Sequence, residues 1–305
     1  MVELGDFMKK LSSILLFFSL ILLLCNGTQA IRYSEQALTI WFESLIPSMF
    51  VCMVLIRTLY KQQLIARLCP HWLCHLFHLQ SSEMALFIST LLLGFPNGSM
   101  LIDEAYAAKQ ITKASAKRLF LICCFPTPGF VILTCGIHIF HQASIGFLLY
   151  FVQVVYGLIC LLCYHPRQGE RRIDLPAPKT TWMNDLRTSI VESGVALFMM
   201  GGYLMVFMTL SALFLHFIPL SAALPLRIVS EFSSGVFLIQ STTLSLSTCL
   251  YLTCALLGFG GFCVHMQIYA MCEHHHASYL SFLAMRCIQA IVTLLFFCLL
   301  YQLLV

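Results

Sequence analysis

Length, composition and charge place this chain in a membrane. It has 305 residues, of which 60% are hydrophobic and 10% charged, and its mean hydropathy is +0.89. A water-soluble core does not absorb that much apolar surface, so a soluble globular domain is excluded. The formal net charge of +4 is small and is concentrated in loops, so a nucleic-acid-binding surface is not indicated. We expect an all-α fold, a polytopic transmembrane helical bundle.

The first segment, 1–30, is an N-terminal anchor or signal segment. Lys9 and Lys10 precede an apolar run over 11–25, and polar residues follow that run. A cleaved signal peptide and a first membrane anchor share this pattern. Either alternative places the residues that follow on the outer side of the membrane.

Further apolar stretches are candidates to enter the bilayer, although not all of them need to cross it. They run over 37–56, 84–101, 119–137, 143–164, 190–217, 224–240, 244–257 and 279–304. About 20 residues of helix span the hydrocarbon core.

Basic residues help to decide which stretches cross, because Lys and Arg accumulate in cytoplasmic loops. Three loops carry them: Arg57, Lys61 and Arg67; Lys109, Lys113, Lys117 and Arg118; and Arg167, Arg171, Arg172, Lys179 and Arg187. If 84–101 crossed completely, the first two loops would lie on opposite sides. Pro96 and the glycines around it favour a reversal, so we expect a re-entrant hairpin near 84–102 that keeps both loops inside.

The third basic loop divides the chain into two membrane halves. It lies in 165–189, contains three prolines and is the most polar linker of the sequence. We therefore expect a first half over 31–164, a cytoplasmic linker over 165–189 and a second half over 190–305. Few basic residues follow the linker, so charge does not specify the crossings of the second half.

Broken apolar segments recur in both halves and indicate an inverted repeat. Leu92–Phe95 and Leu256–Phe259 have the same four letters, and 126–129 and 233–235 are further breaks. Paired breaks of this kind are typical of transporters with a site near mid-membrane. A broken helix exposes amides and carbonyls that a polar ligand satisfies, and its N-terminus favours an anion. The alternative is that these breaks only permit close packing or kinks.

Ionisable and polar residues within the apolar stretches are candidates for solute contacts. Glu231 lies four residues after Arg227, so pairing of the two on one helical face is the alternative role for its carboxylate. For His265 the alternative is a hydrogen bond between helices. Asp103 and Glu104 lie beside a basic loop, and we expect them to be solvated.

Metal, cofactor and enzyme sites are not predicted. The segments 69–78 and 273–276 are rich in metal-ligand side chains, but neither has a paired zinc-finger spacing. The first is expected to be an amphipathic interfacial helix. Most of the 15 cysteines lie inside apolar runs and are expected to be packing residues. No P-loop, dinucleotide fingerprint or nucleophile with its base has a convincing context.

An ordered set of motifs resembles the YlbJ-type sporulation integral membrane proteins of the nucleoside-recognition or Gate-domain group. The motifs are at 94–99, 105–106, 111–113, 116–119, 201–203, 231–235 and 258–267. The chain departs from that family at 124–128, where Cys124 and Phe125 stand in a break that usually contains asparagines.

The resemblance implies a fold similar to concentrative nucleoside transporters and a location in a bacterial cell membrane, specifically the outer forespore membrane. It also implies movement of a small polar or anionic solute such as dipicolinate. The alternative function is a non-transporting membrane scaffold or assembly factor for spore envelope formation. The predicted solute contacts are Gly94, Pro96, Asn97, Gly98, Ser99, Thr127, Pro128, Glu231, Ser233, Ser234, Gly258, Gly260, Gly261, His265 and Gln267. The sequence does not identify a coupling ion.

Overall fold

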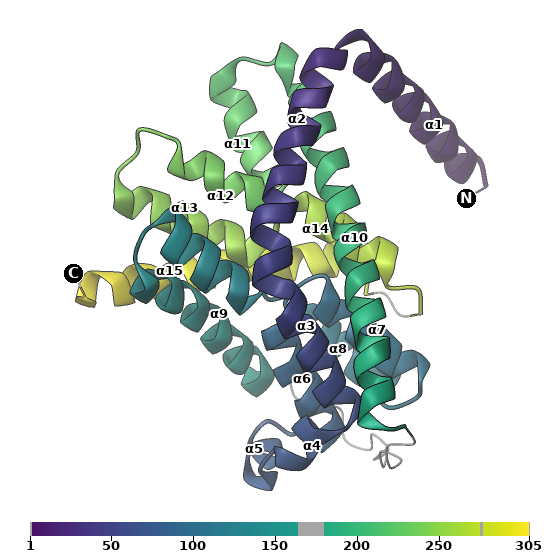
Figure 1. Ribbon diagram of the computed structural model, residues 1–305, viewed down its shortest axis with the longest axis vertical. Coiled ribbons are helices and arrows are strands. Elements are labelled where there is room, and N and C mark those ends of the chain that lie inside the picture. Colours follow the sequence, from purple (N-terminus) through teal and green to yellow (C-terminus); the bar gives the residue numbers. More distant parts are fainter. Residues whose placement is uncertain (1, 164–179, 275–276, 305) are drawn as a thin grey trace.

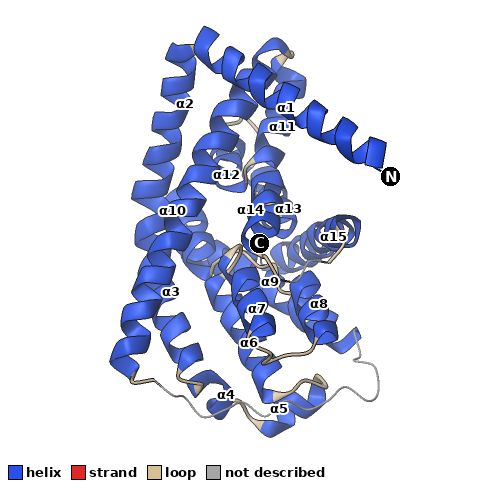
Figure 2. Ribbon diagram, turned by 90° about the vertical axis from the view of Figure 1, so that its right-hand side faces the viewer, coloured by secondary structure: helices blue, strands red, loops and turns tan. Residues whose placement is uncertain are grey.

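Helices and their connecting loops account for all of the chain that the computed structural model describes, which is residues 2–163, 180–274 and 277–304. Figure 2 shows no strand in these ranges. The all-α prediction is confirmed for them.

Five helical segments are long and apolar enough to cross a membrane. They are Gly27–Lys61, Ala143–Cys163, Trp182–Phe217, Leu246–Met271 and Tyr279–Leu303. The first contains α2 (Gly27–Thr39), a π-helical stretch η1 (Ile40–Leu45) and α3 (Ile46–Lys61). The third contains α10 (Trp182–Phe214) and the short 3₁₀ turn η3 (Leu215–Phe217). The chain is therefore a multi-pass membrane protein, as its composition predicted.

Shorter helices lie between these long ones. In the first half they are α4 (Leu64–Leu68), α5 (His71–Leu76), α6 (Ser81–Leu93), α7 (Asn97–Ala107), α8 (Lys113–Ile122) and the π-helical η2 (Gly129–Ile139), before α9 (Ala143–Cys163). In the second half they are α11 (Leu220–Ser230), α12 (Phe232–Gln240), α13 (Leu246–Phe259) and α14 (Gly261–Met271), before α15 (Tyr279–Leu304). The chain begins with α1 (Val2–Cys25), which extends away from the bundle in Figure 1.

The same order of elements occurs in both halves. In each half a long helix precedes two short helices that pack on each other, α6 with α7 and α11 with α12, and only the first half has additional short helices, α4 and α5, before this pair. A helix with a central break comes next, α8–η2 and α13–α14, and a second long helix ends each half. By this order, the break at Gly94 corresponds to that at Glu231. The four-letter match of Leu92–Phe95 with Leu256–Phe259 therefore joins different elements and does not align the two halves.

The long helices pair in antiparallel fashion. Ser34 of the first long helix contacts Thr209 of α10, and Trp41 contacts Leu197. Residue numbers therefore increase along one helix in the direction in which they decrease along the other. The Trp41 Nε1–H donates to the Leu197 carbonyl at 2.8 Å. In Figure 1, α2, α3 and α10 lie side by side, with α11–α12 towards one end of them and α6–α7 towards the other. The two hairpins thus approach the middle from opposite ends.

The described parts of the basic segments lie at one end of the molecule. The Tyr60 hydroxyl donates to Gln110 at 3.0 Å, and Lys61 Nζ lies 2.6 Å from a Glu192 carboxylate oxygen. The end of α3, the loop after α7 and the beginning of α10 therefore lie together. Because α10 begins at Trp182, it includes the end of the predicted linker 165–189, of which 165–179 lie outside the described residues.

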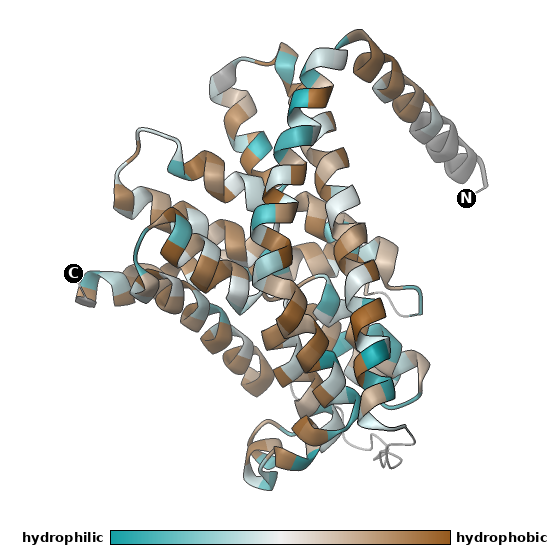
Figure 3. Ribbon diagram, viewed as in Figure 1, coloured by the Kyte–Doolittle hydropathy of each residue, from teal (hydrophilic) through white to brown (hydrophobic). Residues whose placement is uncertain are grey.

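Apolar side chains cover much of the surface, as helices facing lipid require. Phe198 of α10 and Leu280 of α15 are 71% and 77% exposed, and Figure 3 shows hydrophobic residues along α9, α10 and α15. Cys124, Cys135 and Cys254 are fully buried free thiols, which agrees with a packing role. Cys52 and Cys287 are instead exposed on the outside of the bundle.

Candidate functional site

The tip of the first hairpin rests on the break between α8 and η2. Gly94 has φ +65°, and a Cβ at this position would lie 2.5 Å from the backbone nitrogen of Thr127, so a side chain is sterically excluded there. The next residue, Phe95, donates its backbone N–H to the Phe125 carbonyl at 2.7 Å. These contacts join two breaks of the first half.

The same tip also contacts both breaks of the second half. The ring centroids of Phe95 and Phe232 are 4.9 Å apart, and those of Phe130 and Phe232 are 5.1 Å apart. Gly260 lies beside the Phe95 ring, and a Cβ on Gly261 would lie 3.0 Å from the Phe232 nitrogen. All four breaks therefore meet at one place inside the bundle, which we call the junction.

Buried polar groups lie beside the junction. Asn97 and Ser99, in the first turn of α7, are fully buried. Asn97 Nδ2 donates to the sulfur atoms of Met53 and Met200 at 3.6 and 3.7 Å. Within the described chain, neither Asn97 Oδ1 nor the Ser99 hydroxyl has a hydrogen-bond partner. Buried polar atoms are normally paired, so these two mark α7 as a place for a polar ligand.

The four helix N-termini at the junction differ in their caps. Glu231 accepts hydrogen bonds from the backbone N–H groups of Ser233 and Ser234 at 3.0 and 2.6 Å, so it caps α12. The Thr127 hydroxyl accepts from Phe130 N–H at 3.2 Å and caps η2, which Pro128 precedes. In contrast, α7 begins after Pro96 and α14 after Gly260 without a side-chain cap. Helices α7 and α14 contact each other, and a helix N-terminus without a side-chain cap favours an anion or polar group.

The alternative role of Glu231, pairing with Arg227 on one helical face, does not occur in the structure. Helix α11 ends at Ser230, and Glu231 has an extended backbone, so the two residues do not share a helix. The Arg227 guanidinium instead lies over the Tyr33 ring, 5.2 Å from its centroid. Glu231 is buried, and its carboxylate faces the amides of its own helix.

The predicted contacts in the second broken helix have mainly structural partners. His265 Nε2 lies 2.9 Å from the Phe259 carbonyl, so this nitrogen carries the proton, and Nδ1 lies 3.4 Å from the Tyr279 hydroxyl. This is the hydrogen bond between helices that the sequence left as an alternative. Gln267 donates to the Cys263 sulfur at 3.2 Å. A Cβ on Gly258 would lie 2.9 Å from Ala290 Cα, so this glycine serves close packing against α15.

Two further predicted residues lie close to the junction in packed surroundings. Gly98 faces Thr90 of α6, where a Cβ would lie 3.0 Å from the threonine Cβ. The Ser233 hydroxyl is buried without a hydrogen-bond partner among the described residues. Of these two, only Ser233 offers an unpaired polar atom.

Asp103 is not solvated, contrary to the prediction. It is 5% exposed, and its carboxylate accepts hydrogen bonds from the backbone N–H groups of Glu273 and His274 at 2.9 and 3.1 Å. The His274 Nδ1 lies 3.0 Å from the same carboxylate. Asp103 therefore joins α7 to the segment after α14. Glu104 is half-exposed and lies 3.3 Å from buried Arg57, so it too has a partner.

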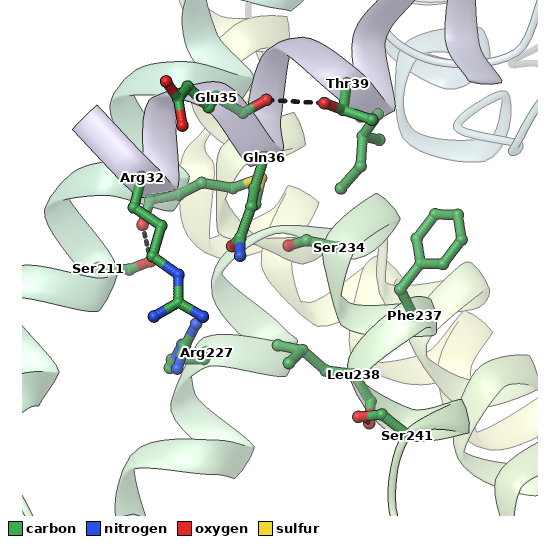
Figure 4. Close-up of a pocket in the computed structure, with 12 residues that line it drawn as sticks. Arg32, Glu35, Gln36, Thr39, Ser211, Arg227, Ser234, Phe237, Leu238 and Ser241 are labelled. Carbon is green, nitrogen blue, oxygen red and sulfur yellow. Dashed lines mark hydrogen bonds between the residues drawn. The ribbon is translucent and has the colours of Figure 1, made fainter. Parts of the chain in front are cut away.

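A cavity of about 580 Å³ runs from the N-terminal part of α2 to the second hairpin. Its lining residues include Arg32, Gln36, Arg227, Ser234 and Ser241. In Figure 4 the guanidinium groups of Arg32 and Arg227 point toward each other, while the carboxylate of Glu35 turns away from them. Neither arginine forms an ion pair with a carboxylate of the described chain. Two arginines and one glutamate line the cavity, whose formal charge is therefore positive, and its lining includes Ser234, three residues after Glu231.

The metal-ligand side chains singled out from the sequence do not gather into a set of three or more within the described residues. The thiols of Cys69 and Cys74 lie 3.7 Å apart. Burial raises the pKa of the Cys69 thiol to about 11, which opposes the thiolate that a zinc ion requires. His275 and His276 of the second segment lie outside the described residues.

Sequence reasoning missed Arg286, the only Lys, Arg, Asp, Glu or His of α15. It is fully buried, and its guanidinium donates to the carbonyl oxygens of Leu121 and Cys124 at the end of α8. The signal was available, because an ionisable residue within an apolar stretch is a functional candidate by default.

No family model matches the chain, and neither a curated protein nor a solved structure matches it.

Proposed function

We propose that this protein is a transporter-like carrier that moves a small polar or anionic solute across a bacterial membrane. The observation that carries the proposal is the junction, where four broken helices meet inside a bundle of membrane-spanning helices. Interrupted helices at membrane depth are tolerated where protein buries them or where they line a polar cavity. Such breaks hold solutes and ions in secondary transporters.

An inverted repeat is the second part of the proposal. The repeated order of elements supports it, as does the antiparallel pairing of the long helices. Gln153 and Gln289 add weight, since each is the eleventh residue of its helix, counted from Ala143 of α9 and Tyr279 of α15. Gln289 Nε2 donates to Gln153 Oε1 at 2.8 Å. Equivalent residues meet each other at a two-fold axis.

In this arrangement α6–α7 and α11–α12 are re-entrant hairpins that enter from opposite sides of the membrane. The basic segments gathered at the end of α3 then mark the cytoplasmic side. The Asp103 contact supports the same side for the segment after α14.

An anionic solute suits this site better than a cationic one. The N-termini of α7 and α14 lack side-chain caps, and two arginines without carboxylate partners line the cavity. By its resemblance to the sporulation membrane proteins, the chain would act in the outer forespore membrane on a dipicolinate-like dicarboxylate. Glu231 already supplies the anion at the N-terminus of α12, so the solute site is assigned to α7 and α14.

A non-transporting scaffold is the second candidate, and two observations favour it. The rings of Phe95, Phe130 and Phe232 fill the junction. Caps from the chain's own side chains also satisfy several of the broken ends. If the breaks serve only packing, the folded protein moves no solute.

Flux measurements in liposomes separate these two functions. Purified protein is reconstituted, and uptake of radiolabelled dipicolinate is compared with uptake into protein-free liposomes. Asn97→Leu removes the buried amide and should lower uptake about tenfold or more, which is the effect of losing one hydrogen bond to a charged solute. Gly202→Ala on α10, where a Cβ meets no atom within 4 Å, is the matched control and should leave uptake unchanged. Uptake by the folded wild type that equals the protein-free rate contradicts dipicolinate transport and favours the scaffold.

A further inference from the structure

Arg286 is a fully buried cation without a buried anion beside it. Nη1 donates to the Cys124 carbonyl at 2.7 Å, and Nη2 donates to the Leu121 carbonyl at 2.5 Å. The guanidinium also donates to the amide oxygen of Gln289 and contacts the Cys124 thiol, and the Phe282 ring centroid lies 5.3 Å away. No carboxylate of the described chain pairs with it. Because arginine stays protonated in proteins, a positive charge is fixed at this position.

The carbonyls that hold this charge belong to the C-terminal end of a broken helix. Helix α8 ends at Ile122, and the chain is irregular until η2 begins at Gly129. The last carbonyls of a helix lack backbone partners and carry the negative end of the helix dipole. In transporters with broken helices, such carbonyls coordinate the Na⁺ or H⁺ that drives transport. Here a guanidinium satisfies them.

In the second half, a side chain also satisfies a carbonyl at the corresponding helix end. Helix α13 ends at Phe259, and the Phe259 carbonyl accepts a hydrogen bond from His265 Nε2 at 2.9 Å. Both broken helices therefore have C-terminal carbonyls satisfied by side chains of this chain. Only the first of the two donors has a permanent charge.

We propose that Arg286 is a built-in cation that takes the place of a coupling ion at the C-terminus of α8, so that the protein binds and moves its solute without Na⁺ or K⁺. This inference rests on the proposed transport function. In this proposal Arg286 occupies the break at 123–128, which then has a structural role. The solute is left to the uncapped N-termini of α7 and α14.

A test by thermal unfolding needs no solute and so is independent of the transport proposal. The melting temperature of the detergent-solubilised wild type is measured in NaCl, KCl and choline chloride at equal ionic strength, and we expect it to be the same in all three. A rise of several degrees that is specific to Na⁺ or K⁺ would overturn the proposal, because it reveals a bound cation.

Substitutions of Arg286 test whether the carbonyls require a charge. Arg286→Met should lower the melting temperature by about 5–10 °C, because it leaves buried carbonyls unpaired, and Arg286→Lys should recover a large part of that loss. Arg187→Met, at an exposed position of α10, is the control and should have no effect. Equal stability of the Met and Lys variants contradicts a role for the charge. Should Arg286→Met fail to purify, the salt comparison on the wild type and Arg286→Lys still decides the question.

Reconstituted protein gives the functional arm. If dipicolinate uptake is observed, its rate should be the same with Na⁺, K⁺ or choline outside the liposomes. Uptake that requires Na⁺ or K⁺ overturns the inference while leaving the transport proposal intact. Absence of uptake contradicts the transport proposal, and the melting temperatures then still report on Arg286.

Discussion

At the scale of single residues, the junction depends on charged and small side chains that satisfy or approach the backbone. Glu231 accepts two amide hydrogen bonds at the start of α12, Arg286 donates to two carbonyls at the end of α8, and Gly94 lets one hairpin tip reach Thr127. The Glu231 and Arg286 side chains each satisfy a helix end that lipid would leave unsatisfied, whereas Gly94 acts by having no side chain. These roles predict changes in stability as well as in activity.

Glu231→Gln should lower the free energy of unfolding by about 1–3 kcal/mol. Glutamine keeps one acceptor but loses the charge that strengthens the hydrogen bonds from Ser233 and Ser234. Thermal unfolding in detergent measures the change, with Glu35→Gln at an exposed position of α2 as the control. A Glu231→Gln variant as stable as the control would show that the carboxylate is not needed as a cap.

Gly94→Ala should lower the free energy of unfolding more than Gly202→Ala does. Its Cβ would lie within 2.8 Å of three Thr127 atoms at a φ of +65°, so the hairpin tip would have to move, at a cost of at least about 2 kcal/mol. Gly202→Ala, with open space around its Cβ, should be neutral or slightly stabilising. Comparison of the two melting temperatures decides, and equal values contradict the close contact.

At the scale of elements, hydropathy and helix breakers predicted the observed structure better than charge pairing did. Apolar length predicted the long helices, because lipid leaves a spanning segment few alternatives. Glycine and proline marked the breaks near 94–99, 126–129 and 258–261, because they interrupt hydrogen bonding in the sequence itself. The partners of Asp103, Arg286 and Glu231 depend on which helices approach each other, and no local pattern contains that information. The alternative pairing of Glu231 with Arg227 does not occur, because helix α11 ends at Ser230, between two residues that would share a face if the helix continued.

Asp103→Asn should loosen the segment after α14. The carboxylate now accepts from two backbone amides and from the His274 ring, and an asparagine replaces only part of that acceptor capacity. Hydrogen exchange at the amides of Glu273 and His274 should become faster, by about tenfold for a loss near 1.4 kcal/mol. Glu273→Gln, at an exposed side chain, should leave this exchange unchanged. Unchanged exchange in Asp103→Asn contradicts the link between the two halves.

At the scale of the whole molecule, two halves with the same order of elements meet in antiparallel fashion, and their hairpins enter from opposite ends. Two predicted features follow from this arrangement. One is the cytoplasmic location of the basic segments, and the other is a solute path through the junction. Each of them has a direct experiment.

Short epitope tags in two loops should become accessible on opposite sides of the membrane. The loop between α7 and α8, 108–112, should be cytoplasmic, because it contacts the end of α3 and is basic. The loop between α12 and α13, 241–245, should be on the outer side. Antibody binding to right-side-out and inverted vesicles measures both positions. Accessibility of both tags from the same side contradicts the inverted arrangement of the hairpins.

A cross-link between the two hairpin tips tests the central claim most directly, because it combines the junction with transport. Phe95 and Phe232 contact each other from the two halves, so Phe95→Cys and Phe232→Cys in one chain should be joined by a short, reducible bifunctional thiol reagent, detected by mass spectrometry of the linked peptides. We predict that dipicolinate uptake by the cross-linked protein in liposomes stops and that reduction restores it, while the reagent leaves uptake by each single variant unchanged. Uptake that continues at the same rate in fully cross-linked protein would contradict a solute path through the junction.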